Sequence, residues 1–387
     1  MSNMAEKLQK YCTVISGYAF KSKDLSEGTD IPVIKIGNIS NGENVAIDDS
    51  TQYVNEEFLS IDEKYHIKNG DILISLTGSH MNQPNSMVGR CCRNLDDTIY
   101  LLNQRAGKII PKKSVDKDFL YYVFRLPSIQ YAIANRAYGG ANQVNVSPKD
   151  VMGIKFDIPD ITIQRKIANA LIAYDTLIQN NNKRIRLLEQ MAENLYKEWF
   201  VRFRFPGYED VEFENRIPKG WEYCKLINFI DVRYGKDHKN IEEGAIPILG
   251  SGGIMRFGDR ALYNGEAVLI PRKGSLNNIM YINGEFWTVD TLFYSIPKIK
   301  NIARYLYFTF KYIDMGSLNS GASIPSMTTD IIYHLKMRQP DAAVLEKFDE
   351  VLKPIYEEID LLGKRNDNIK KQRDMLLPRL MSGKLEV

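Results

Sequence analysis

Two long heptad patterns, one in each half of the chain, most constrain how this sequence can fold. Pro159-Asp160 precedes a pattern that runs toward Phe200, and Pro340-Asp341 precedes a second that runs toward Met381. Six further identities keep the same offset of 181 residues: Lys166, Leu171, Ile178, Lys183, Arg184 and Leu195 align with Lys347, Leu352, Ile359, Lys364, Arg365 and Leu376. At about 1.5 Å rise per residue, each helix would be roughly 55–60 Å long. The pattern predicts a duplicated chain in which a globular region precedes a long helix twice.

In each predicted helix the apolar positions alternate steps of four and three, the spacing of a coiled-coil seam. The seam positions are Ile167, Leu171, Tyr174, Ile178, Asn181, Ile185, Leu188, Ala192, Leu195 and Trp199 in the first helix, and Phe348, Leu352, Ile355, Ile359, Leu362, Asn366, Ile369, Arg373, Leu376 and Leu380 in the second. A stripe this narrow needs a partner helix to cover it, so we predict that the two helices pack together. The alternative is that both are core helices of one large domain.

An antiparallel register would place Asn181 opposite Asn366, and a buried amide pair penalises other registers. The same register predicts four further facing pairs: Ile178 with Ile369, Ile185 with Leu362, Leu195 with Leu352, and Trp199 with Phe348. Pro354 is expected to kink or restart the second helix because it lacks a backbone N–H. Gly363 weakens the middle of that helix, and Pro378 is expected to mark its last turn.

The regions before the two helices also repeat. The first reads as strands and turns with a short helix at 117–137, and the second keeps the same order of motifs. The matched segments are IPVIKIGN (31–38) with IPILGSGG (246–253), NGDILISLTGS (69–79) with NGEAVLIPRKGS (264–275), YGGANQVNVSPKDV (138–151) with NSGASIPSMTTDI (319–331), and Lys7-Leu8 and Gly17 with Lys225-Leu226 and Gly235. The segment 204–220 is rich in proline, glycine and charge and is expected to be an exposed crossing.

Composition is that of an ordinary globular protein, with 44% hydrophobic and 26% charged residues. No apolar run approaches the roughly 20 residues of a membrane span, and the N-terminus lacks the apolar core of a secretory signal. The four cysteines show no metal-ligand spacing, so we expect a reducing, cytoplasmic setting. A net charge of only +3 means that nucleic-acid binding would depend on local clusters of Lys and Arg.

Motifs after each helix resemble those of the specificity subunits of type I restriction-modification systems. These are LYKEWFVRFRFPG (195–207) and RDMLLPRLMSGKLEV (373–387), together with IPKGWEYCKL (217–226) at the start of the second recognition region. The resemblance covers nearly the whole chain. One departure is the N-terminus, which lacks a Pro-x-Gly-Trp motif, so the first recognition domain is expected to have a shortened edge.

The resemblance implies a subunit without catalysis of its own. Two target recognition domains would each bind one half of a split site in double-stranded DNA, with the two-helix spacer setting the gap. Two methyltransferase subunits and, in the full nuclease, ATP-driven restriction subunits would be its partners. S-adenosylmethionine, ATP and Mg would be held by those partners, which would methylate adenine N6 and cleave DNA, and this chain would hold no cofactor and no metal.

The catalytic motifs that such chemistry needs are absent from the sequence. There is no Pro-Pro pair for an adenine methyltransferase motif, and Arg272-Lys273-Gly274-Ser275, the nearest approach to a P-loop, lacks its Gly-x4-Gly-Lys-Ser/Thr pattern. In Gly250-Ser251-Gly252-Gly253 the last glycine of a dinucleotide fingerprint is replaced by Met255. The four histidines show no ligand spacing. No catalytic residue is predicted.

The candidate DNA contacts lie in two matched pairs of polar loops. Asn and Gln can pair with adenine, Arg with guanine, and small residues let backbone amides approach phosphate. The candidates are Thr77, Ser79, Asn82, Gln83, Asn142 and Gln143 in the first half, and Arg272, Lys273, Ser275, Asn277, Asn278 and Ser323 in the second. The alternative is that these loops are only solvated turns that close each domain.

The sequence thus predicts an α+β fold with a pseudo-two-fold internal repeat, in which two globular α/β target recognition domains are joined by two long antiparallel coiled-coil helices. The predicted segments are recognition domain 1 at 1–158, a central helix at 159–203, a linker and recognition domain 2 at 204–339, and a C-terminal helix at 340–387. The predicted function is DNA sequence specificity in a type I restriction-modification complex. The alternative is a scaffold without DNA that holds two protein-binding domains apart on a coiled-coil rod.

Overall fold

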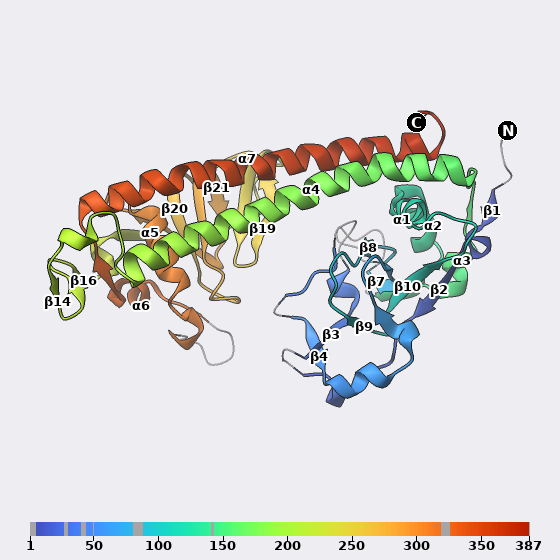
Figure 1. The fold of residues 1–387 in the computed structure, drawn as a ribbon, viewed down its shortest axis with the longest axis horizontal. Coiled ribbons are helices and arrows are strands. Elements are labelled where there is room, and N and C mark those ends of the chain that lie inside the picture. The colour runs from blue at the N-terminus through green and yellow to red at the C-terminus, as the bar shows by residue number, and fades with distance from the viewer. Residues whose placement is uncertain are drawn as a thin grey trace. The chain divides into compact units, whose positions relative to one another are not determined.

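The computed structural model describes residues 5–26, 30–39, 44–48, 50–79, 88–140, 143–318 and 326–386. The chain forms two compact units, and each contains one globular region and part of both long helices. Unit 1 comprises residues 1–179 and 366–387, and unit 2 comprises residues 180–365. The two helices, α4 (Ile161–Tyr196) and α7 (Ala342–Met381), are coloured green and red in Figure 1.

The globular region of unit 1 is built on two four-stranded sheets with strand orders β2-β10-β6-β8 and β4-β3-β9-β5. A three-stranded sheet, β11-β12-β7, and the pair β1-β13 complete it. The strands are β1 (Glu6–Lys7), β2 (Cys12–Ser16), β3 (Ile31–Ile34), β4 (Gln52–Val54), β5 (His66–Ile67), β6 (Ile72–Ser75), β7 (Thr77–Gly78), β8 (Cys91–Arg93), β9 (Tyr100–Leu102), β10 (Ala106–Pro111), β11 (Tyr138–Gly140), β12 (Gln143–Asn145) and β13 (Lys155–Phe156).

The helix predicted at 117–137 is two helices, α1 (Lys117–Arg125) and α2 (Pro127–Ala134). Leu126 between them is extended because it precedes Pro127, which disfavours the helical conformation at the residue before it. Asp116 caps α1 by accepting hydrogen bonds from two backbone amides of its first turn. A further short helix, α3 (Pro148–Met152), follows β12.

Unit 2 joins the corresponding strands into one six-stranded sheet of order β17-β22-β20-β21-β18-β19. The separate pairs are β16-β23 and β14-β15. The strands are β14 (Phe213–Glu214), β15 (Ile217–Pro218), β16 (Glu222–Lys225), β17 (Ile230–Tyr234), β18 (Ile246–Gly250), β19 (Gly253–Gly258), β20 (Tyr263–Pro271), β21 (Met280–Thr288), β22 (Leu292–Pro297) and β23 (Lys336–Gln339). The shorter helices of this unit are α5 (Ala303–Lys311) and α6 (Thr329–His334).

The sheets of the two units differ because one long strand of unit 2, β21, corresponds to two separate strands of unit 1, β8 and β9. In unit 1, β8 pairs with β6 while the separate strand β9 lies parallel to β3. In unit 2, β21 is nine residues long; its first part pairs with β20 and its end lies parallel to β18. A continuous β21 therefore merges two sheets into one.

The predicted repeat of Gly17 and Gly235 has a structural cause. A Cβ on Gly17 would lie 2.3 Å from the carbonyl oxygen of Leu102, and a Cβ on Gly235 would lie 2.0 Å from that of Val289. Their amides donate to the equivalent carbonyls of Ala106 and Leu292. Only glycine allows this close approach of two backbones.

The matched openings of the two halves also adopt the same hydrogen bonds. The Leu8 amide donates to Ile154 O and the Leu226 amide to Leu335 O, both at 2.8 Å. The pairing of β1 with β13 involves two residue pairs among the described residues, whereas β16 pairs with β23 over four.

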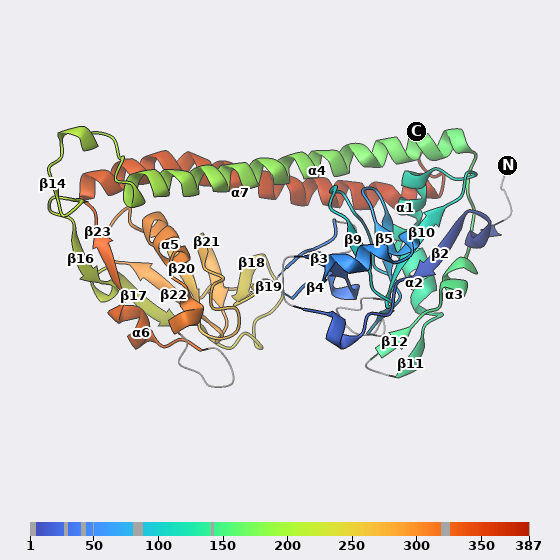
Figure 2. The ribbon, with the colours of Figure 1, turned by 60° about the horizontal axis from the view of Figure 1, so that its bottom comes forward.

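Within each unit the segments of α4 and α7 are side by side, as Figures 1 and 2 show. In unit 2, Arg184 lies 2.8 Å from Glu358, and the ring of Trp199 lies 5.5 Å from that of Phe348. From the first contact to the second, the residue number in the first segment rises while that of its α7 partner falls, so the segments are antiparallel. The Trp199–Phe348 contact confirms that part of the predicted register. Asn181 and Asn366 fall in different units, so their pairing stays a prediction.

Burial along the helices follows the heptad positions. Of the eight seam residues nearest the middle of the two helices, Ile178, Leu362 and Asn366 are buried, and Asn181, Ile185, Leu188, Ile359 and Ile369 are partly exposed. Of the kink or restart expected at Pro354, the restart does not occur, because α7 continues as one helix to Met381. The ring of Pro354 lies on the exposed side, and the helix on both sides is held by packing of Leu352 and Ile355. Pro378 lies in the last turn, as expected.

Each unit has its own large apolar core. In unit 1, the α4 residues Ile167 and Leu171 and the α7 residues Leu377 and Leu380 pack with the sheet and α1. In unit 2, Trp199 and Phe200 on a π-helical turn (Lys197–Val201) after α4 pack with Phe348 and the domain core. The long helices are therefore part of the apolar core of each unit.

No helix in the described part of the chain is long and apolar enough to cross a membrane. Among the same residues no group of three or more His, Cys, Asp or Glu is arranged to hold a metal ion.

Candidate nucleic-acid interface

In unit 1 the two predicted polar loops start from strands that are paired with each other. β7 pairs with β12, so Thr77 faces Asn145 and Gly78 faces Val144. The Thr77 hydroxyl donates to Asn145 Oδ1 at 2.8 Å. Two segments whose paired residues Thr77 and Asn145 are 68 positions apart in sequence thus lead into one surface.

Unit 2 brings its two loops together in the same way. Lys273 forms an antiparallel bridge with Ser326. The Met327 amide donates to Arg272 O at 2.9 Å, as the Val146 amide donates to Leu76 O in unit 1. These bonds align Lys273 with Thr77, and the following Gly-Ser pairs align as well.

The predicted contacts of unit 1 differ in how far they are available to a ligand. Thr77 is buried and its hydroxyl is engaged with Asn145, so it holds the two strands together. Ser79 is half-buried and makes polar contacts within the protein. Gln143 is exposed at the start of β12. Asn82, Gln83 and Asn142 lie outside the described residues.

In unit 2 the candidates divide into exposed and anchoring side chains. Lys273 and Ser275 are exposed. Asn277 donates to Asp314 and accepts from the Gly316 amide, while Asn278 donates to Ser251 O at 2.8 Å. Asn278 therefore fixes the loop to the turn between β18 and β19. Ser323 lies outside the described residues.

Arg272 lies beside an aromatic ring that the sequence analysis did not single out. Its guanidinium lies 5.5 Å from the ring centre of Tyr234 and donates to Asp290 O at 3.2 Å. Stacking holds the cation in place at the edge of the surface. Tyr234 is 53% exposed and is a candidate that the sequence reasoning missed.

Tyr138 is a second missed residue. It is 61% exposed on β11, which pairs with β12 beside the loop of unit 1. Exposed aromatic rings beside glycines are a signal of nucleic-acid contact that could have been found in Tyr138-Gly139-Gly140. The turn at Gly250-Ser251-Gly252-Gly253 is a third missed element, since Ser251 contacts the recognition loop through Asn278.

A buried ion network holds the globular region of unit 1 against its helices. Asp175 of α4 lies 2.6 Å from Arg373 of α7 and 3.5 Å from Arg93 of β8, and it accepts a hydrogen bond from Tyr122 at 2.6 Å. Arg93 also pairs with Asp118 of α1. Burial acts to lower the pKa of Arg373, but hydrogen bonds to Asp374 and Asp175 outweigh it and raise the pKa above its usual value. The network fixes the recognition surface to the helix segments.

Comparison with known proteins gives the family. A family model described as the type I restriction modification DNA specificity domain matches residues 5–190 and again residues 218–371. Together these matches span most of the chain, so it belongs to this family and contains two copies of the domain.

Among curated proteins, the type I restriction enzyme MjaIX specificity subunit of Methanocaldococcus jannaschii is 27% identical over 315 residues, covering 74% of this chain and 73% of that protein. The MjaVIII specificity subunit of the same organism is 24% identical over 376 residues, covering 87% and 85%. Among solved structures, a type I restriction-modification system S subunit from M. genitalium shares the fold, with a TM-score of 0.53 and 17% identity over 98% of this chain and 97% of that one.

Proposed function

We propose that the chain is the DNA specificity subunit of a type I restriction-modification complex. Each unit binds one half of a bipartite target in double-stranded DNA, and the helix pair sets the gap between the halves. The observation that carries this proposal is the matched pair of loops in each unit. Equivalent backbone hydrogen bonds join the two loops, from the Val146 amide to Leu76 O in unit 1 and from the Met327 amide to Arg272 O in unit 2. Membership of the specificity-domain family supports it.

The two surfaces differ in the chemistry that they offer to DNA. Unit 2 presents Arg272, Lys273 and Ser275 beside Tyr234, whereas unit 1 presents Gln143 and Tyr138. Cationic side chains position a phosphate backbone, while amides and hydroxyls can distinguish base edges. Two unlike surfaces on one repeated frame suit two different half-sites.

The subunit itself is proposed to be non-catalytic and to act in the cytoplasm with two methyltransferase subunits and restriction subunits. S-adenosylmethionine, ATP and Mg would be bound by those partners. The long helices offer exposed apolar side chains that would suit subunit docking: Leu177, Leu187 and Met191 on α4, and Val351, Leu361 and Met375 on α7.

Methylome sequencing of cells that express this chain with its methyltransferase tests the proposal. The expected result is adenine methylation at one bipartite motif with a fixed gap, lost when this chain is omitted. Methylation at an uninterrupted site, or methylation that persists without the chain, would contradict it.

The rival function is a scaffold without DNA. Retention on a DNA column, measured for the complex with the methyltransferase, separates the two. Retention that falls steeply with salt is expected for DNA binding, because phosphate contacts release counterions. A scaffold would flow through at low salt.

A further inference from the structure

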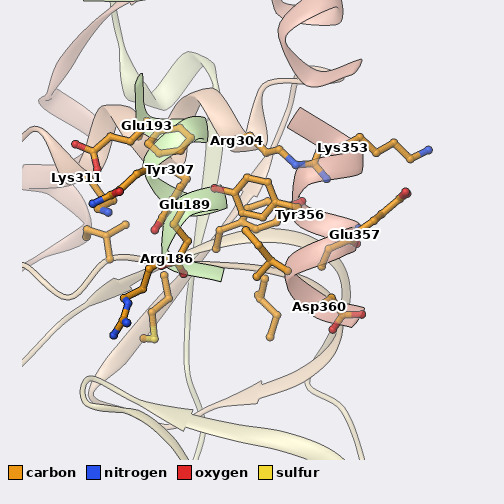
Figure 3. Close-up of a pocket in the computed structure, with 18 residues that line it drawn as sticks. Arg186, Glu189, Glu193, Arg304, Tyr307, Lys311, Lys353, Tyr356, Glu357 and Asp360 are labelled. Atoms are coloured by element: carbon orange, nitrogen blue, oxygen red, sulfur yellow. The ribbon is translucent and has the colours of Figure 1, made fainter. Parts of the chain in front are cut away.

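Unit 2 contains a pocket of about 740 Å³ that has no assigned role. It is lined by residues of α4, β21, α5 and α7, so the recognition domain and both helix segments of this unit contribute to it. Figure 3 shows the rings of Tyr307 and Tyr356 among the lining residues, with charged side chains around them. A volume of this size is typical of ligand and peptide-anchor sites.

The ion network of unit 1 and the pocket of unit 2 occupy the same place in the repeat. Arg93 pairs with Ile72 in the β6–β8 ladder, and Tyr281 pairs with Val268 in the β20–β21 ladder. Ile72 lies three residues before Ser75, which pairs with Ala106, and Val268 lies three residues before Pro271, which pairs with Leu292. Ala106 and Leu292 are themselves equivalent, because their carbonyls accept the hydrogen bonds of the Gly17 and Gly235 amides. Arg93 and Tyr281 are therefore equivalent.

The other members of the network have equivalents in the pocket as well. Asp118 and Arg304 are both the second residue of a nine-residue helix, and Tyr122 and Phe308 are both the sixth. The offset of 181 residues between the long helices aligns Asp175 with Tyr356 and Ala192 with Arg373. Thus Arg93, Asp118, Tyr122 and Asp175 correspond to the pocket residues Tyr281, Arg304, Phe308 and Tyr356.

These replacements explain why unit 2 has a pocket at the place where unit 1 has packed, ion-paired side chains. In unit 1, Arg373 is 4% exposed and bridges to Asp175 across the helix pair. In unit 2 the equivalent of Arg373 is Ala192, which has no side chain to make that bridge. Arg304 instead pairs with Asp349 and lies 5.2 Å from the ring centre of Tyr281 and 5.4 Å from that of Tyr356.

The charges of the pocket give no positive excess that would favour an anionic ligand. Its cations are Arg186, Arg304, Lys311 and Lys353, and its carboxylates are Glu189, Glu193, Glu357 and Asp360, so the formal charges cancel. A phosphate-binding site would carry a positive excess. Tyrosine and arginine around an apolar floor are instead enriched at the anchor points of protein interfaces.

We propose that this pocket anchors a segment of the methyltransferase subunit that presents a large apolar or aromatic side chain next to residues of both charges. The proposal rests on the proposed function and adds to it that docking is unequal. The methyltransferase at unit 2 gains an anchor that the one at unit 1 lacks, because unit 1 fills the equivalent place with its own ion network. Two methyltransferase subunits should therefore bind in two steps of different affinity.

The test titrates the full-length chain with purified methyltransferase by calorimetry and native mass spectrometry. Ile282→Trp fills the pocket, and Glu357→Lys changes an exposed charge at its edge without disturbing the core. Thr176→Lys is the matched control, since Thr176 is the exposed equivalent of Glu357 in unit 1. Thermal unfolding of each variant shows that it is folded.

The wild type is expected to bind two methyltransferase subunits in two resolved steps. Each pocket variant should weaken one step by about tenfold or more, equivalent to about 1.4 kcal/mol, and leave the other step unchanged. The control should leave both steps unchanged. Unaltered steps in both pocket variants, equal weakening of both steps, or a change in DNA affinity in place of methyltransferase affinity would overturn the pocket proposal. Absence of any methyltransferase binding by the wild type would instead overturn the proposed function.

Discussion

The guanidinium of Arg373 lies 2.6 Å from the carboxylate of Asp175, and the two residues are 4% and 8% exposed. The residues stand 198 positions apart in the sequence, on the two long helices of unit 1. Arg93 reaches the same carboxylate from β8, so one buried anion is shared by two cations from different elements. This contact fixes a recognition domain to its helix pair.

Asp175→Asn should destabilise unit 1 by about 3–5 kcal/mol, because removing one partner of a buried pair leaves Arg373 and Arg93 uncompensated. Urea unfolding measures the loss. Asp360→Asn is the matched control, since its pair with Lys364 is largely exposed and should contribute about 0–1 kcal/mol. Adding Arg373→Met to Asp175→Asn should restore part of the lost stability. Equal effects of the two Asp→Asn changes would show that the network is not structural.

Gly17→Ala and Gly235→Ala should each destabilise their own unit by about 1–3 kcal/mol, because the new Cβ meets a backbone carbonyl that cannot move aside. The carbonyl oxygens lie 2.3 Å and 2.0 Å from the Cβ positions. Gly37→Ala and Gly252→Ala, which meet nothing within 4 Å, are the controls and should keep wild-type melting temperatures. Thermal unfolding of the four variants checks the prediction, and a control as unstable as Gly17→Ala would refute it.

Lys273→Ala should weaken DNA binding to all sequences alike and lower the slope of log K against log salt by about 1, as expected for the loss of one phosphate contact. Fluorescence anisotropy of the methyltransferase complex with target DNA at several salt concentrations measures both. Lys300→Ala makes the same charge change past the opposite end of β22 and should leave the slope unchanged. A larger effect of Lys300→Ala would place the DNA on another surface.

Inserting four residues into both long helices should lengthen the unrecognised gap without altering either half-site. One added turn is about 6 Å, which is close to two base pairs of B-DNA. Methylome sequencing gives the gap and the half-sites directly. Insertion into one helix alone breaks the pairing and should abolish methylation. Altered half-sites with the original gap would contradict the role of the helices as a spacer.

Alkaline pH should destabilise unit 1 in part through Tyr100. Burial raises the pKa of Tyr100 to about 12, and a hydrogen bond to Asp96 adds to the effect. The ordinary tyrosine pKa is about 10. The folded state therefore keeps a proton that the unfolded state loses, so this contribution is complete below about pH 10 and disappears as the pH rises toward about 12. Denaturation midpoints of wild type and Tyr100→Phe at about pH 9 and pH 11 measure it. The wild type should lose more stability than the variant, and parallel losses would refute the prediction.

Local sequence patterns predicted much of the architecture because they depend on near neighbours. The heptad steps gave the long helices, and the Trp199–Phe348 contact agrees with their antiparallel register. The strands at 31–34 and 72–75 lie within segments that were predicted from their apolar residues and turns. One error was local as well: the break before Pro127 was missed. Of the kink or restart expected at Pro354, the restart does not occur, because packing keeps the helix continuous.

The candidate interface was predicted only as separate loops. Their convergence depends on the pairing of β7 with β12 and on the bridge between Lys273 and Ser326, which are contacts between distant segments. Burial of Thr77 and the stacking of Arg272 on Tyr234 likewise follow from the packed fold. Residue type alone could not separate the side chains that face a ligand from those that hold the loops.

The sequence by itself determined the duplication, the helices and the family of this protein, because repeated motifs and heptad spacing are written in residue order. Only the tertiary structure decided that Asp175 meets Arg373 in unit 1 while Tyr356 borders an open pocket in unit 2. The physical reason is that a buried charge and a cavity are properties of side chains brought together from distant elements, and their energies depend on the neighbours that packing supplies.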